Sequence, residues 1–258
     1  MLASCDGCRS GASFPVSFTM AFQPIVDVAA GSIWGYEALV RGLNGEGAGE
    51  VLAAVTEENR YRFDQACRVK AIELAGAHMP QGSRAKLSIN FMPNAVYEPE
   101  ACIRASLAAA ARVNFDPTRL MFEFTENEEL SDTAHVQNII ASYQAMGFTT
   151  ALDDFGAGHA GLTLLARFQP DLIKLDMELI RGIETSPARG AIVRGIVGIA
   201  AELGVLVLAE GVETEAELLS LRAAGIRLVQ GYFFARPEIE TFRRADEIAV
   251  LGALRATA

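Results

Sequence analysis

Segments typical of β-strands alternate with segments of helical spacing along most of this chain of 258 residues. A strand that is followed by a helix and then by another strand is typical of a parallel sheet, because the helix carries the chain back to the starting edge. Eight strands within this length favour a closed β/α barrel over an open sheet. The strand-like runs are apolar, β-branched or aromatic and cover residues 18–27, 32–40, 86–91, 120–125, 149–152, 172–175, 205–209 and 226–229.

The intervening stretches carry the signals of helix ends. Gly147, Gly204 and Gly225 each follow a helical stretch and precede a strand, as expected of a glycine C-cap. Thr214, with Glu217 three residues later, predicts a capping box at the start of a helix. The predicted helices cover residues 62–78, 99–113, 133–146, 187–203 and 213–224.

The first two strands are an exception to the alternation. Only residues 28–31 join the runs 18–27 and 32–40, which is too short for a crossover helix. We therefore predict an antiparallel hairpin there. The expected fold is α/β, a modified TIM (β/α)₈ barrel with an antiparallel first strand over residues 18–250, preceded by an N-terminal extension of residues 1–17.

The charge balance limits the possible partners. Lys and Arg number 22 against 32 Asp and Glu, a net charge of −10, so double-stranded nucleic acid is not expected to bind. A phosphate ligand stays possible, because divalent cations can lie between carboxylates and phosphates. The chain shows no apolar run of membrane-spanning length, no secretory signal and only four cysteines, which predicts a cytoplasmic protein. The Cys5-x-x-Cys8 motif could be half of a zinc site or a redox pair, and its role is left open.

Polar residues gather where the predicted strands end, and in a β/α barrel such positions converge at one mouth. Any single acid there could simply cap a helix or form a surface ion pair. The whole set would repel itself unless cations were present. Carboxylate and amide oxygens suit Mg²⁺ or Mn²⁺, and adjacent Asp153 and Asp154 could bridge two ions. The set comprises Glu37, Asn90, Glu123, Glu126, Asp153, Asp154, Lys174, Asp176, Glu210, Glu213 and Gln230.

These residues lie within motifs that resemble the EAL-domain cyclic di-GMP phosphodiesterases. The resemblance covers about residues 18 to 245 and follows the family's motif order. Its specificity lies in eight motifs at suitable spacing, because a lone Glu-Ala-Leu tripeptide would mean almost nothing. Two of these motifs are the signature Glu37-Ala38-Leu39, followed by Arg41, and the pair Asp153-Asp154. The remaining matches are Phe22–Asp27, Ser88–Asn90, Glu123–Glu126, Ile173–Asp176, Ala209–Glu213 and Gln230–Phe233.

The resemblance implies hydrolysis of one phosphodiester bond of cyclic di-GMP to linear 5′-pGpG. It also implies two Mg²⁺ or Mn²⁺ ions, inhibition by Ca²⁺, and a homodimer. By the same resemblance Lys174 and Glu210 act in catalysis, and Glu126 braces the loop that follows Asp154. The implied metal ligands are Glu37, Asn90, Glu123, Asp153 and Asp154, with Glu37 also counted as catalytic. The implied substrate contacts are Gln23, Arg41, Asp176, Glu213 and Gln230.

Two other functions fit the same sequence. The first is a catalytically silent module that senses cyclic di-GMP and acts through a protein partner. Silent members of the family typically lose metal ligands or the base. Here the acids, Asn90 and Lys174 are all present, which favours the enzyme over the silent module. The second is an unrelated metal-dependent barrel enzyme, which a panel of cyclic dinucleotides would distinguish.

Overall fold

The computed structural model describes residue 14 and residues 16–125, 133–158 and 161–256. Its strands are β1 (Phe18–Asp27), β2 (Ser32–Gly42), β3 (Lys86–Asn90), β4 (Leu120–Thr125), β5 (Thr149–Phe155), β6 (Leu172–Leu175), β7 (Leu206–Ala209), β8 (Leu228–Val229) and β9 (Glu238–Ile239). Its helices are α2 (Ala48–Leu52), α3 (Arg60–His78), α4 (Pro99–Cys102), α5 (Arg104–Arg112), α6 (Thr133–Ala145), α7 (Gly161–Arg167), α8 (Met177–Ile180), α9 (Pro187–Leu203), α10 (Glu215–Ala223) and α11 (Ala249–Ala256). One-turn 3₁₀ helices lie at Pro93–Ala95, Pro117–Arg119, Ile183–Thr185 and Ala245–Glu247.

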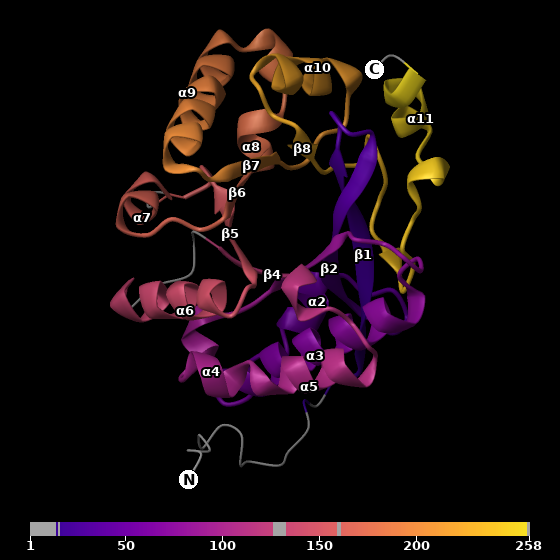
Figure 1. Ribbon diagram of the computed structural model, residues 1–258, viewed down its shortest axis with the longest axis vertical. Coiled ribbons are helices and arrows are strands. Elements are labelled where there is room, and N and C mark those ends of the chain that lie inside the picture. Colours follow the sequence, from indigo (N-terminus) through magenta and orange to yellow (C-terminus); the bar gives the residue numbers. More distant parts are fainter. Residues whose placement is uncertain (1–13, 15, 126–132, 159–160, 257–258) are drawn as a thin grey trace.

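The strands close into a barrel. Strands β2 to β8 pair in chain order and in parallel, and β1 completes the ring by pairing antiparallel with both β2 and β8. The expected barrel with an antiparallel first strand is therefore confirmed. Strand β9 pairs with a different part of β1, through Ala21 and Phe22. Figure 1 shows the helices outside the ring of strands, with α9 and α10 on one side and α3 and α5 on the opposite side.

Two layers of inward-facing side chains fill the barrel. The lower layer is apolar and consists of Ile25, Met121, Ala151, Leu172, Leu208 and Leu228, with the partly buried Trp34 packed against it. Because side chains on a strand alternate between faces, the residue two positions further toward the mouth also points inward. Those residues are polar in all six cases, four on the strands and two directly after β7 and β8: Gln23, Glu123, Asp153, Lys174, Glu210 and Gln230. We call these six residues the polar layer.

The predicted helix ends are confirmed. Gly147, Gly204 and Gly225 have φ angles of 85°, 71° and 93°, in the left-handed region that glycine tolerates best. The Thr214 hydroxyl accepts a hydrogen bond from the Glu217 backbone N–H, and the Glu217 carboxylate accepts one from the Thr214 N–H. A large apolar core lies between the outer face of the strands and the helices.

Several boundaries differ from the sequence prediction. Strand β5 extends to Phe155, so Asp153 and Asp154 lie inside it rather than at its close. Acids disfavour strands in general, and here the pairing of Asp153 with β4 and of Phe155 with β6 overrides that preference. The predicted helix 99–113 is divided into α4 and α5 at Ile103. The short elements α7, α8 and β9 were not expected, because two to seven residues carry little periodic signal.

Candidate metal and substrate site

Lys174 lies at the centre of the polar layer with its side chain almost fully buried. Its Nζ is 2.7 Å from Glu210 Oε1, 2.9 Å from Glu123 Oε2, 3.1 Å from Asp153 Oδ1 and 3.5 Å from Glu37 Oε1. Those four acids come from β2, β4, β5 and the end of β7, and each is distant from the others in the chain. The structure therefore brings together residues that the sequence scatters across 173 positions, from Glu37 to Glu210.

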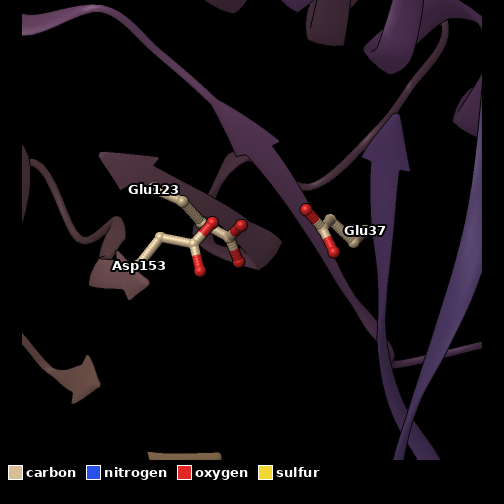
Figure 2. A group of neighbouring side chains, drawn as sticks. All are labelled: Glu37, Glu123 and Asp153. Carbon is tan, nitrogen blue, oxygen red and sulfur yellow. The ribbon is translucent and has the colours of Figure 1, made fainter. Parts of the chain in front are cut away.

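Glu37 faces this cluster from β2. Figure 2 shows the Asp153 and Glu123 carboxylates lying together, with the Glu37 carboxylate opposite them. Asn90 Nδ2 donates to Glu37 Oε1 at 3.1 Å, and Gln230 Nε2 donates to Glu37 Oε2 at 2.7 Å. Both amides therefore orient the glutamate, and the Asn90 side chain reaches the cluster from the end of β3.

The carboxylates form two overlapping groups that could each hold a cation. Ligand atoms of Glu37, Glu123 and Asp153 lie within 4.8 Å of one another, and so do those of Asp153, Asp154 and Glu210. Asp153 belongs to both groups. Five carboxylates share one ammonium group, so if all are ionised two divalent cations would balance the remaining charge. Oxygen donors of this kind fit Mg²⁺ or Mn²⁺.

Burial and mutual repulsion change the acidity of these groups. Burial, with help from Glu37 and Asp153, raises the pKa of Glu123 to about 8, although Lys174 opposes the shift. Burial and Asp153 also raise the pKa of Glu210 well above its ordinary value. For Lys174, burial acts to lower the pKa, but the surrounding carboxylates outweigh it and hold the pKa well above its usual range. A bound cation would favour the ionised form of these acids and so act against both upward shifts in pKa.

Asp154 has an uncommon backbone conformation beside this cluster. Its φ angle of 55° lies in the left-handed region, where residues other than glycine are strained. Its backbone N–H donates to Asp153 Oδ1 at 2.9 Å. Burial and the neighbouring Asp153 raise the pKa of Asp154 to about 6. This irregular backbone therefore presents two adjacent carboxylates to the same region.

A cavity of about 320 Å³ opens beside Glu37 and Glu210. Four of the five predicted substrate contacts line it: Gln23, Asp176, Glu213 and Gln230. Gln230 Nε2 donates to Gln23 Oε1 at 3.0 Å, whereas the buried Gln230 Oε1 has no hydrogen-bond partner. An unpaired buried acceptor is costly in a folded protein, and its position at this cavity is consistent with a ligand donor.

The remaining predicted residues are placed differently. Arg41 does not line the 320 Å³ cavity, and its Nη1 donates to the carbonyl of Val40 at 2.7 Å. Asn90 borders a second, more apolar cavity of about 920 Å³, and Leu39 lines both cavities. Asp176 also caps α8, because its side chain accepts from the Glu178 N–H. Glu126, Cys5 and Cys8 lie outside the residues that the structure describes.

Sequence reasoning missed two polar residues of the site. Ser88 donates its hydroxyl to Glu123 Oε1 from the inner face of β3. Its position two residues before Asn90 on the same strand was the available signal. Arg181 lines the 320 Å³ cavity and pairs with Glu213, but it follows α8, an element that the sequence pattern did not reveal.

The model of the EAL domain family matches residues 16–237, and the chain belongs to that family. Among curated relatives, it is 36% identical over 222 residues to the blue light- and temperature-regulated antirepressor BluF of Escherichia coli, covering 85% of this chain and 54% of BluF. It is 31% identical over 244 residues to the cyclic di-GMP phosphodiesterase NbdA of Pseudomonas aeruginosa, covering 87% of this chain and 30% of NbdA. The chain thus spans about half or less of the length of these relatives.

Solved structures share the fold and contain ligands. The chain is 51% identical to a standalone EAL protein from Vibrio cholerae O395 in its c-di-GMP-bound form, with a TM-score of 0.85 over 90% of this chain and 97% of that one. It is 38% identical to Klebsiella pneumoniae BlrP1 in a complex with manganese and cyclic di-GMP, with a TM-score of 0.79 over 89% of this chain and 58% of that one.

Proposed function

We propose that this protein hydrolyses one phosphodiester bond of cyclic di-GMP to linear 5′-pGpG and requires Mg²⁺ or Mn²⁺. The observation that carries the proposal is the convergence of Glu37, Glu123, Asp153 and Glu210 on Lys174 beside a cavity. Membership of the EAL family and the ligands of the solved structures support the choice of substrate and metal.

The oxygen donors divide between two cation positions. Glu37, Asn90, Glu123 and Asp153 would hold the first ion, and Asp153 and Asp154 would hold the second. When bound, such ions neutralise phosphate charge and lower the pKa of water. Calcium accepts looser coordination than either ion, so we expect Ca²⁺ to inhibit.

The protein's own groups supply the proton chemistry and the binding contacts. Glu210 contacts Lys174 at the cavity, and burial and Asp153 raise the pKa of its carboxylate, which makes it a stronger proton acceptor, as a general base requires. Lys174 Nζ, held by four carboxylates, stabilises negative charge as it develops. The free Gln230 Oε1 can accept a hydrogen bond from a ligand N–H group. Arg41 lies on the same face of β2 as Glu37, which places it to meet a phosphate.

A turnover assay tests this proposal. The chain would be incubated with cyclic di-GMP and either MgCl₂ or MnCl₂, and the linear dinucleotide would be followed by chromatography. We expect product only when the metal is present, and less product when CaCl₂ replaces it. Failure to form linear product with either metal, in protein that is folded, would contradict the proposal.

A second candidate is a catalytically silent module that binds cyclic di-GMP and acts through a protein partner. The likeness to BluF, which is named an antirepressor, favours this alternative. Calorimetric titration with cyclic di-GMP, run beside the turnover assay, separates the two. Tight binding without product would identify the sensor, whereas binding with product would identify the enzyme.

The proposal also includes a homodimer and a cytoplasmic location. Among the described residues, no helix combines the length and apolar character needed to cross a membrane. Light scattering after gel filtration would measure the mass of the assembly. Fractionation of cells that express the tagged chain would establish the location.

A further inference from the structure

A buried ion pair lies on α3. Its two residues belong neither to the polar layer nor to the lining of the two cavities described above. Asp64 Oδ2 and Arg68 Nη2 are 2.8 Å apart, with exposed side-chain fractions of 1% and 0%. Burying two charges is expensive, and an apolar pair of similar volume is often equally stable there. The pair therefore calls for an explanation other than stability, and its contacts supply one.

Both members of the pair hold the chain immediately after β3. Asp64 Oδ1 accepts a hydrogen bond from the Met92 backbone N–H at 3.0 Å. The Arg68 guanidinium lies over the rings of Phe91 and Phe122, at 5.2 and 5.4 Å from their centroids. The pair thus contacts two successive residues, Phe91 and Met92, by a ring contact and a backbone hydrogen bond.

These contacts lie directly behind two residues proposed as metal ligands. Phe91 follows Asn90, and Phe122 precedes Glu123. Because neighbouring residues on a strand point to opposite faces, the rings face α3 while Asn90 and Glu123 face the barrel interior. The Phe91 N–H donates to the Glu123 carbonyl at 2.8 Å, which joins the residue after β3 to β4. Asn90 is the last residue of β3 and is exposed, so its own burial does little to fix it.

We propose that the Asp64–Arg68 pair is a positioning device that fixes Asn90, and with it Glu123, in the geometry that divalent cations require. Neither residue touches the cations or the substrate. The inference rests on the proposed metal site. Supporting groups of this kind commonly change metal affinity by about 10- to 100-fold when they are removed.

The test removes both charges together, so that no uncompensated ion remains in the core. The double variant Asp64→Leu/Arg68→Met would be compared with the wild-type chain by calorimetric titration with MnCl₂ alone. We expect Mn²⁺ to bind the double variant about tenfold more weakly. Thermal melting by circular dichroism would establish that both proteins are folded at the temperature of titration. A purely structural pair would lower the melting temperature but leave the affinity unchanged.

Glu73→Gln is the matched control. Glu73 lies on the same helix and forms an ion pair with Arg112 at 2.7 Å, but the two side chains are 41% and 55% exposed, so this pair is not buried. We expect Glu73→Gln to bind Mn²⁺ like the wild-type chain. If the double variant does not fold, Arg68→Lys replaces it, because lysine keeps the charge facing Asp64 but loses the flat guanidinium over Phe91 and Phe122. We expect about threefold weaker binding in that case.

The experiment distinguishes failure of the positioning role from failure of the proposed metal site. If the wild-type chain itself fails to bind Mn²⁺, the metal site is wrong. If the wild-type chain binds and the folded double variant binds equally well, the positioning role is overturned. Wild-type affinity in Arg68→Lys would overturn it in the same way where only that variant folds.

Discussion

Lys174 holds the acids of the site together, because its ammonium group contacts the carboxylates of Glu37, Glu123, Asp153 and Glu210. A buried lysine is normally expensive, and here four acids compensate it. In return, the lysine allows acids from four strands to approach one another before any cation arrives. The same contacts keep its charge at neutral pH, since they hold its pKa well above the ordinary value.

Replacing Glu37 or Asp153 with alanine should abolish turnover of cyclic di-GMP and leave the fold intact. Both side chains lie in the polar layer or beside it, so neither contributes to the apolar core. Both belong to the first carboxylate group, and removing a ligand should also weaken Mn²⁺ binding. Product formation and circular dichroism would be measured together. Near-normal activity in either folded variant would show that the ligand assignment is wrong.

Tyr36 makes stability depend on alkaline pH. Burial, followed by the charge of Glu247, raises the pKa of Tyr36 from 10.0 to about 12, and its hydroxyl donates to the Arg243 carbonyl at 2.9 Å. Between these pH values the unfolded chain has lost this proton while the folded chain still holds it. The free energy of unfolding should therefore fall as pH rises from about 10 to 12.

The variant Tyr36→Phe should lack this part of the pH dependence. It should also lose about 1 kcal/mol at neutral pH, because the Arg243 carbonyl loses its donor. Urea denaturation of both proteins at pH 8 and pH 11 measures the two effects. An equal loss of stability between these pH values in both proteins would contradict the assignment.

At the scale of elements, the connections after β6 and β7 are joined by one buried carboxylate. Glu217 on α10 accepts hydrogen bonds from the backbone N–H groups of Glu213 and Thr214, at 2.9 and 3.1 Å. It also accepts one from the Gly182 N–H at 3.3 Å and lies 3.8 Å from Arg181 Nη1. Glu217 therefore ties together two segments that line the 320 Å³ cavity.

Glu217→Gln should weaken binding of cyclic di-GMP severalfold. Glutamine can still complete the capping box, but it has a single acceptor oxygen and no charge to face Arg181. Calorimetric titration with cyclic di-GMP measures the affinity. The matched control is Glu215→Gln, which removes an exposed acid from the first turn of the same helix. Equal affinities in the two variants would refute a role for Glu217 in shaping the cavity.

Element positions were largely predictable, whereas the short elements at the mouth were not. Strands β1, β4 and β6 and helix α9 have the predicted bounds, because apolar runs and caps mark them clearly. The capping box at Thr214 was also predicted. The interactions of Glu217 with Gly182 and Arg181 were not, since they join segments more than thirty residues apart through a turn without periodic signal. Long-range contacts of this kind need the closed barrel to define them.

At the scale of the whole molecule, the net charge of −10 is concentrated in part around the barrel mouth. An acidic protein repels an anionic ligand, and the cluster repels itself as its acids ionise. Divalent cations would relieve both effects at once. Metal binding should therefore stabilise the entire fold, since the carboxylates come from strands spread around the ring.

Removal of metal with EDTA should lower the melting temperature, and added MnCl₂ should raise it by several degrees. A ligand at a hundred times its Kd stabilises a folded protein by about 2.7 kcal/mol. Thermal melting with EDTA and with MnCl₂ measures the difference. Asp153→Asn is the control, because Asp153 belongs to both carboxylate groups and its variant should respond weakly. Identical melting of the wild-type chain under both conditions would argue against resident cations.

The arrangement of the whole barrel could be predicted from the sequence, but the hydrogen-bond partners of individual side chains could not. The short link between residues 27 and 32 predicted the antiparallel hairpin, and the strand-end acids predicted the mouth. The sequence could not show that Arg41 donates to its neighbour's carbonyl while Gln230 keeps a free buried oxygen. Such details depend on rotamers chosen by packing, which a linear pattern does not encode.

The register of the antiparallel first strand fixes the position of one residue of the site. Gln23 lies opposite Glu37 in the register of β1 and β2, and its amide oxygen accepts from Gln230. Sliding β1 by one residue would turn Gln23 out of the barrel, and sliding it by two would move Gln23 about 7 Å along its neighbours. A slip of either size would part the two glutamines. The hairpin that closes the barrel therefore also sets the distance between Gln23 and Gln230, two residues of the proposed substrate site.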